Sequence, residues 1–220
     1  MFSYYGSKSK IAKHYPAPGR DTIVEPFAGS AQYSVLYPEK QVILIEKHKP
    51  VAELWRWLIH DASPSDVLRL PVFGPKERID MAAGPERTLV AFESNGGTET
   101  PRNVAGNFNR WYKNGRQRIA NLLPKIKHWV IIEGDYLLDS PDVDATWFVD
   151  PPYQYGGHEY TEGGRGFDYS ACRSFCDSRR GQLIVCEASP ASWMDFTPLI
   201  QQRGQRFSRQ EVVLLRGFDK

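Results

Sequence analysis

A carboxylate, two prolines and a tyrosine follow directly after a short apolar run and could act together on an amino group. They are Asp150, Pro151, Pro152 and Tyr153, and the run before them covers residues 145–149. Asp150 can accept a hydrogen bond from an exocyclic amine on a flat ring, and proline, which has no N–H, leaves acceptor-only carbonyls around it. Tyr153 offers a face on which an extruded base can stack. A rigid turn at a strand end is the alternative interpretation, because Asp and Pro are common turn residues.

Three further residues lie at the ends of predicted strands, where an open α/β sheet binds its ligands. Gly29 follows the first strand, at a turn whose missing side chain lets a nucleoside approach the backbone. Glu46 ends the second strand, and an acid there suits the two hydroxyls of a ribose. Asp135 follows the third strand and could accept a hydrogen bond from an adenine amine. Each could singly be an ordinary turn or strand-end residue, but together with Asp150 they occupy four successive strand ends, which favours a ligand site.

The elements that would position these residues alternate between strands and helices. Apolar runs predict five buried strands and a late sixth, at residues 22–25, 41–46, 129–133, 145–149, 182–186 and 210–216. Helices are expected after the first strand through Leu36, over residues 51–59 and near residues 170–178. This order predicts an α/β fold of Rossmann-like type, with a mostly parallel sheet and helices on both faces.

The alternation is interrupted in the middle of the chain, where prolines and glycines punctuate short segments. We therefore expect three parts: residues 1–62 as the N-terminal part of a core, residues 63–123 as a small inserted subdomain, and residues 124–220 as the C-terminal part of the core. Glycines at the end of residues 156–165 predict a mobile loop before the last helix.

Composition describes an ordinary soluble protein. The chain of 220 residues fits one domain with an insertion, and its 41% hydrophobic and 25% charged residues are typical values. No apolar stretch reaches the roughly 18 residues needed to cross a bilayer, and the first residues lack the layout of a signal peptide. Cys172, Cys176 and Cys186 are few and have no metal-site spacing. These features predict a cytoplasmic protein with reduced thiols, no membrane partner and no metal.

Charge is unevenly distributed along the chain, although the net charge is only +2. Residues 101–132 contain no acid but seven Lys and Arg residues, interleaved with Phe108, Trp111 and Tyr112. Such a stretch suits phosphate contact and base stacking, and a solvated helix face is the alternative. The candidates for nucleic-acid binding are Arg110, Lys113, Arg116 and Arg118.

Taken together, these motifs resemble those of the Dam-like, alpha-group N6-adenine DNA methyltransferases, which use S-adenosylmethionine. Residues 4–8 (YYGSK) resemble the family's N-terminal cofactor motif, and residues 24–31 (VEPFAGSA) resemble its main cofactor loop. Residues 150–153 (DPPY) match its catalytic motif in full. The order of the motifs is that of the alpha group, and the resemblance covers roughly residues 1–60 and 125–190.

The resemblance implies a Rossmann-like methyltransferase fold and transfer of a methyl group to adenine in DNA, with the target base flipped out of the duplex. It places Glu46 on the cofactor ribose and Asp135 near its adenine. The full cofactor set is Tyr4, Lys8, Glu25, Pro26, Phe27, Gly29, Glu46, Asp135 and Asp150. The tetrapeptide Asp150, Pro151, Pro152 and Tyr153 would handle the target base, and residues 101–127 with the loop 156–165 would contact DNA.

Two departures from the family pattern affect these expectations. The second glycine of the cofactor loop is Ala31 here, which narrows the turn. The insertion is short and matches no target-recognition domain, so specificity is expected to be either site-specific or relaxed.

Three other functions fit parts of the pattern. RNA adenine methylation would use the same chemistry, although Asp in first position and the motif order favour DNA. A non-catalytic nucleic-acid-binding relative is the second, with Ala31 as an early sign of decay, but the catalytic tetrapeptide is intact. A nicotinamide-dependent dehydrogenase is disfavoured because no G-x-G-x-x-G loop is present.

Overall fold

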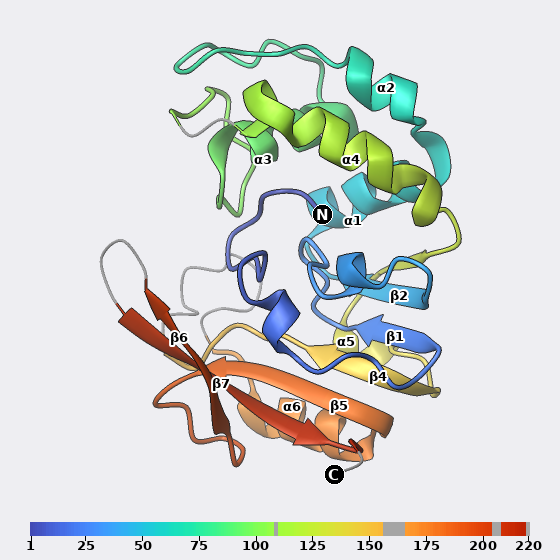
Figure 1. Ribbon diagram of the computed structural model, residues 1–220, viewed down its shortest axis with the longest axis vertical. Helices are drawn as coiled ribbons and strands as arrows, with labels where there is room; N and C mark the ends of the chain where they lie inside the picture. The colour runs from blue at the N-terminus through green and yellow to red at the C-terminus, as the bar shows by residue number, and fades with distance from the viewer. Residues whose placement is uncertain (108–109, 156–165, 204–207, 219–220) are drawn as a thin grey trace.

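One mostly parallel sheet organises the chain (Figure 1). The computed structural model describes residues 1–107, 110–155, 166–203 and 208–218. In these residues seven strands lie in the order β3-β2-β1-β4-β5-β7-β6, and β7 runs antiparallel to both of its neighbours. The strands are β1 Thr22–Glu25, β2 Gln41–Glu46, β3 Val130–Glu133, β4 Asp144–Val149, β5 Arg180–Ala188, β6 Thr197–Arg203 and β7 Ser208–Arg216.

The central strands are apolar on both faces because helices cover both sides of the sheet. Along β4, Trp147 packs into one core cluster and Phe148 into the other, and both side chains are almost fully buried. Helix α1 (Lys49–Arg56) contributes Trp55 to the cluster of Phe148, while α5 (Tyr136–Asp139) and α6 (Tyr169–Ser178) cover the opposite face. The predicted α/β fold, a Rossmann-like sheet with helices on both faces, is therefore confirmed.

The strand order reverses between β1 and β4. After β1 the chain continues to β2 and β3 on one side, and it then returns to place β4 against the other side of β1. Because β1 to β4 are parallel, their carboxyl ends meet at one edge of the sheet. Ligands of open α/β sheets bind in the crevice that such a reversal creates.

The region 63–123 is helical and packs beside α1. It holds α2 (Pro64–Arg69), α3 (Pro85–Asn95) and α4 (Arg116–Leu122), and Figure 1 shows the three helices gathered at one end of the molecule. Helix α3 packs on α1, and α2 packs on α4. Ser63 and Asp66 form a reciprocal capping box that begins α2. No helix in the described part of the chain is both long and apolar enough to span a membrane.

Two elements differ from the sequence predictions. The expected helix through Leu36 is wrong, since only a 3-10 turn forms at Ser34–Leu36. The main-chain N–H of Ser34 donates to the carboxylate of Glu25. It is therefore not available for the hydrogen bond to residue 30 that an α-helix through Leu36 would contain. Strand β6 was not predicted because its sequence is largely polar and contains Pro198, a residue that sheets tolerate at an edge.

Candidate active site

A pocket of about 300 Å³ opens at the carboxyl-terminal edge of the sheet. Its walls come from the N-terminal segment and from the loops that follow β1, β2, β3 and β4. All nine residues predicted for the cofactor line it: Tyr4, Lys8, Glu25, Pro26, Phe27, Gly29, Glu46, Asp135 and Asp150. Pro152 of the predicted catalytic tetrapeptide also lines the pocket. The fold thus brings together residues from five separate segments, as a ligand site at a strand-order reversal requires.

The turn after β1 is fixed by the acid at the end of β2. The carboxylate of Glu46 accepts the main-chain N–H of Gly29 at 2.8 Å with one oxygen, and that of His48 at 2.8 Å with the other. The indole N–H of Trp55 donates to the carbonyl of Gly29 at 2.8 Å. Burial raises the pKa of Glu46 to about 7, while the two N–H donors act in the opposite direction.

Left-handed backbone shapes this turn at two positions. Gly29 has φ of +46°, and a Cβ placed on it would lie 3.3 Å from a ring carbon of Tyr4. Ala31 also has a positive φ, 45°. A left-handed conformation costs an L-residue roughly 1–2 kcal/mol. The turn therefore holds an alanine in a left-handed conformation at position 31.

Glu25 lines the pocket and anchors the turn at Ser34. Its carboxylate accepts both the main-chain N–H and the hydroxyl of Ser34, at 2.8 and 2.6 Å. Burial raises the pKa of Glu25 to about 7, and the bonds from Ser34 lower it in part. Much of the bonding capacity of this carboxylate is thus used to hold the turn that follows the cofactor loop.

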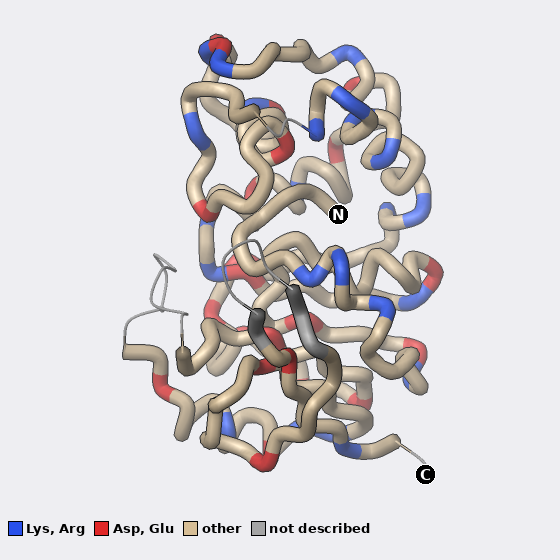
Figure 2. The backbone as a smooth tube through the Cα atoms, turned by 60° about the vertical axis from the view of Figure 1, so that its left-hand side comes forward, with Lys and Arg blue, Asp and Glu red and all other residues tan. Residues whose placement is uncertain are grey.

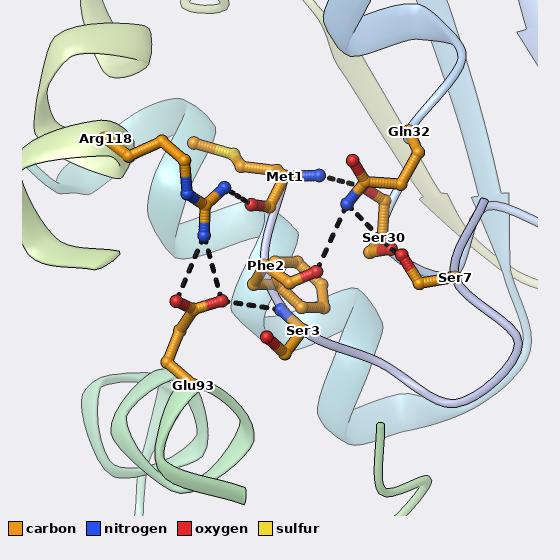
Figure 3. Close-up of polar contacts among 8 residues, drawn as sticks. All are labelled: Met1, Phe2, Ser3, Ser7, Ser30, Gln32, Glu93 and Arg118. Carbon is orange, nitrogen blue, oxygen red and sulfur yellow. Dashed lines mark hydrogen bonds and ion pairs between the residues drawn. The ribbon is translucent and has the colours of Figure 1, made fainter. Parts of the chain in front are cut away.

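The N-terminal segment is tied both to the cofactor loop and to the helices of residues 63–123 (Figure 3). On one side, the amide of Gln32 donates to the carbonyl of Phe2 at 3.3 Å, and the hydroxyls of Ser30 and Ser7 are bonded at 3.1 Å. On the other, Glu93 of α3 accepts the main-chain N–H of Ser3 at 2.6 Å. These bonds fix the start of the segment that carries Tyr4 and Lys8.

Arg118 of α4 belongs to the same network. Its guanidinium pairs with both oxygens of Glu93 at 3.0 Å and donates to the carbonyl of Met1 (Figure 3). Glu93 is fully buried, so the ion pair supplies the partner that a buried carboxylate needs. Arg118 therefore connects the region 63–123 with the N-terminal cofactor segment.

Asp150 forms the centre of a second cluster. The ammonium of Lys8 lies 2.7 Å from a carboxylate oxygen of Asp150 and 4.5 Å from the centre of the Tyr153 ring. The same ammonium is 3.9 Å from an oxygen of Glu211. Burial raises the pKa of Asp150, and the charge of Lys8 opposes that shift. The structure thus surrounds the predicted catalytic carboxylate with a cation and an aromatic ring.

Glu211 is a member of this cluster that sequence reasoning missed. It accepts the hydroxyl of Tyr15 at 2.7 Å and the hydroxyl of Tyr153 on the same oxygen, and it is 2% exposed. Its place follows from topology, because antiparallel β7 aligns Glu211 with Ala188 at the carboxyl end of β5. An acid directly before the apolar run of a late strand was the signal in the sequence, but the edge of the sheet at which it lies was not predictable.

The backbone after Asp150 is held from the next strand. Glu187, fully buried at the end of β5, accepts the main-chain N–H of Gln154 at 3.0 Å and the indole N–H of Trp193 at 2.9 Å. The hydroxyl of Tyr169 donates to the carbonyl of Pro152 at 3.0 Å. These bonds fix the predicted catalytic tetrapeptide at its second proline and beyond. Glu187 and Tyr169 were not predicted.

Asp135 and three aromatic rings form the far wall. Asp135 caps α5 by accepting the N–H of Leu137 at 2.9 Å, and its other oxygen pairs with Lys47 at 3.1 Å. The ring of Phe27 lies 4.6 Å from that of Tyr136 and 5.8 Å from that of Phe167, centre to centre. All three rings line the pocket, which gives it an apolar face suited to a flat heterocycle.

The four candidates for nucleic-acid contact fall into two groups. Arg110 precedes the π-helical turn Trp111–Gly115, Lys113 lies within it, and both are exposed. Arg116 donates to the carbonyl of Leu68 at 3.1 Å, and Arg118, although its side chain is also partly exposed, pairs with Glu93. Figure 2 shows basic residues at this helical end together with acidic ones. Phe108 and the loop 156–165, the other predicted contacts, lie outside the described residues.

Metal ligands do not converge anywhere in residues 1–107, 110–155, 166–203 and 208–218: these contain no group of three His, Cys, Asp or Glu able to hold a metal ion. Cys172, Cys176 and Cys186 are buried free thiols.

No protein-family model matches the chain, and no curated protein is significantly similar to it. Solved structures with a similar fold include two described as a putative methyltransferase, yhhF from Escherichia coli, and a putative methylase, HI0767 from Haemophilus influenzae. The first is 11% identical with a TM-score of 0.39, covering 87% of this chain and 74% of that one. The second is 12% identical with a TM-score of 0.39, covering 87% and 85%. A conserved hypothetical protein of Streptococcus pyogenes is 8% identical with a TM-score of 0.36, covering 87% and 84%.

Proposed function

We propose that this protein is an S-adenosylmethionine-dependent methyltransferase that acts on the N6 amino group of adenine in DNA. One observation carries the proposal: Asp150 lines the same pocket as Gly29, Glu46 and Asp135. A carboxylate suited to bind an amine therefore adjoins a loop and two acids suited to bind a nucleoside. The resemblance of the three motifs to the Dam-like family supports the same function.

The pocket has the chemistry that the cofactor needs. Glu46 would accept the ribose hydroxyls, Asp135 would accept the adenine amine, and the rings of Phe27 and Tyr136 would flank the adenine. A side chain at position 29 would be crowded by the ring of Tyr4. The main chain of Gly29 itself therefore forms this wall of the pocket. The cofactor supplies a methyl group on a cationic sulfur, and the acids of the pocket favour a cation.

Asp150 would orient the target amine. Its carboxylate and the carbonyl of Pro151 accept hydrogen bonds from the two amine protons, which directs the nitrogen lone pair out of the ring plane and toward the methyl group. The nitrogen–carbon bond forms as the carbon–sulfur bond breaks, and the resulting cationic amine then releases a proton to water. Positioning two reactants in this way can supply about 7–11 kcal/mol of the barrier. Asp150 also stabilises the positive charge that develops on nitrogen.

The target base must leave the duplex to reach Asp150, so base flipping is part of the proposal. Tyr153 would then stack on the base. Residues 63–123 would act as the target-recognition region, with exposed Arg110 and Lys113 on the phosphates. This assignment predicts either a site-specific or a relaxed DNA methyltransferase of the cytoplasm.

Methyl transfer from labelled S-adenosylmethionine tests the proposal. Purified protein is offered double-stranded DNA, single-stranded DNA and RNA in parallel, and the products are identified by nucleoside mass spectrometry. We expect N6-methyladenine in DNA and none with Asp150→Ala, which should still bind the cofactor. Label found only in RNA would mean that the substrate is RNA and that the proposed methyl-transfer chemistry still holds. No label despite cofactor binding would indicate a non-catalytic nucleic-acid-binding protein.

A further inference from the structure

The ammonium of Lys8 lies where the proposed mechanism requires the substrate amine. It is 2.7 Å from the Asp150 carboxylate and 4.5 Å from the centre of the Tyr153 ring. A target adenine would need the same two contacts, because its amine must bond to Asp150 while its ring stacks on Tyr153. Lys8 and the base therefore cannot make these contacts together.

A second acceptor for Lys8 lies within a short side-chain rotation. The Oε1 atom of Glu211, which also accepts the hydroxyls of Tyr15 and Tyr153, is 3.9 Å from the ammonium, so a shift of about 1 Å would add a charge-assisted hydrogen bond to this carboxylate. Lys8 and Glu211 are both almost fully buried. A buried ammonium that lost its carboxylate without gaining another would be strongly destabilising, so Glu211 is the expected new partner of Lys8.

Glu211 is also held in place. Its oxygen accepts the hydroxyls of Tyr15 and Tyr153, which come from the N-terminal segment and from the catalytic tetrapeptide. The two hydroxyl donors fix the orientation of the Glu211 carboxylate. Among the charged side chains of this cluster, Asp150 can thus change partner while Glu211 stays fixed.

We propose that Lys8 is a placeholder for the substrate amine, and that Glu211 is the positioning residue that receives the Lys8 ammonium when the target base enters. Before entry, Lys8 neutralises Asp150 and covers Tyr153. On entry, the ammonium moves onto Glu211, and Asp150 becomes available to accept hydrogen bonds from the amine. No covalent bond or proton moves in this exchange. The inference rests on the proposed function for the identity of the incoming amine.

The crystal structure of the Asp150→Asn variant tests the exchange without any activity. The amide keeps the shape of Asp150 but removes its charge, so Lys8 loses its stronger partner. We expect the distance from the Lys8 ammonium to the Glu211 oxygen to fall from 3.9 Å to hydrogen-bond range. If Lys8 stays on the substituted amide at the original distance from Glu211, or turns into the open pocket, the proposal is overturned.

Kinetics of Glu211→Gln test the role of its charge. Glutamine still accepts the two tyrosine hydroxyls but cannot neutralise an ammonium. We expect kcat for methyl transfer to fall about tenfold or more, since a hydrogen bond to a charged group is worth roughly 1.5–3 kcal/mol, while KM for the cofactor changes little. Tyr15→Phe is the matched control, because it removes a neutral donor from the same oxygen and keeps the charge. Equal effects of the two variants, or a parallel loss of cofactor binding, would mean that Glu211 is merely structural.

The two tests separate this inference from the proposed function. If the wild-type protein methylates no nucleic acid, the proposed function fails, and the Asp150→Asn structure still decides whether Glu211 receives Lys8. If the wild type methylates DNA and Glu211→Gln is equally active, the placeholder role is wrong and the methyltransferase stands.

Discussion

The main-chain N–H of Gly29 donates to the carboxylate of Glu46 across 2.8 Å. This bond joins the turn after β1 to the end of β2, two strands that are parallel neighbours. Gly29, at the turn that a nucleoside would approach, and Glu46, the acid that would bind its ribose, are therefore held together by a hydrogen bond. A change in the charge of Glu46 should consequently alter both the turn and the affinity for the cofactor.

Cofactor affinity should rise with pH through neutrality. Burial raises the pKa of Glu46 to about 7, so the carboxylate that we propose as the acceptor of the ribose hydroxyls is fully ionised only above that value. We expect calorimetric titration with S-adenosylmethionine to give tighter binding at pH 8 than at pH 6. Glu46→Gln should bind more weakly and lose most of this pH dependence. An unchanged pH dependence in the variant would assign it to another group.

Gly29→Ala should damage the cofactor loop, whereas Ala31→Gly should not. The first change places a Cβ at φ of +46° and 3.3 Å from the ring of Tyr4, which costs roughly 1–2 kcal/mol of stability and should weaken cofactor binding several-fold. Ala31→Gly relieves the strain of a positive φ of 45°, but it increases the conformational entropy of the unfolded chain and removes a buried methyl group. The free energy of unfolding should therefore stay within about 1 kcal/mol of that of the wild type. Denaturant unfolding and cofactor titration of both variants check this contrast. Similar behaviour of the two would mean that backbone strain does not govern this turn.

The meeting of Gly29, Glu46, Asp135 and Asp150 at one edge of the sheet was predictable, because each lies at or just after the end of an apolar run and parallel strands bring their carboxyl ends together. The position of Glu211 was not predictable. Strand β7 is antiparallel, so a residue near its amino end lies at this edge of the sheet, and the pairing of Glu211 with Ala188 depends on the tertiary fold. Likewise, the basic residues of 101–132 gave no sign that Arg118 would pair with buried Glu93. A charge pattern along the chain does not reveal which cations meet a buried acid.

Stability should fall as the pH rises toward neutrality, and Glu25 should account for part of the loss. Burial raises the pKa of Glu25 from 4.5 to about 7, so the folded state holds this proton more tightly than the unfolded state. The contribution of Glu25 to the free energy of unfolding is therefore fully present below about pH 4.5. It declines by on the order of a few kcal/mol as the pH rises from there to about 7, and the loss is complete above that pH.

Glu25→Gln, which still accepts the bonds from Ser34, should accordingly gain stability relative to the wild type at pH 8 and little at pH 5. Melting temperatures of both proteins at the two pH values provide the measurement. A variant that is less stable than the wild type at pH 8 would show that the ionised carboxylate is needed for the turn.

Removal of the Lys8 charge should shift activity to higher pH. Burial raises the pKa of Asp150 and the Lys8 ammonium opposes that shift, so Lys8→Met should raise the pKa further. Because the proposed transfer requires the ionised carboxylate, the acidic limb of the pH–rate profile should move to higher pH in Lys8→Met. Lys8→Arg keeps the positive charge and serves as the control, with a limb close to that of the wild type. Coincident profiles for the methionine variant and the wild type would contradict this account of Asp150.

DNA affinity should depend on the exposed cations of the helical end and not on the engaged ones. Arg110 and Lys113 are exposed, so alanine at either should weaken binding to all DNA sequences alike and reduce the slope of log affinity against log salt by about one. Arg118 is committed to Glu93, and its replacement by methionine should instead lower the melting temperature, because a buried carboxylate loses its partner. Fluorescence anisotropy at several salt concentrations, paired with thermal unfolding, separates the two effects. If Arg110→Ala and Lys113→Ala leave the salt slope unchanged, the phosphates are bound elsewhere on the protein.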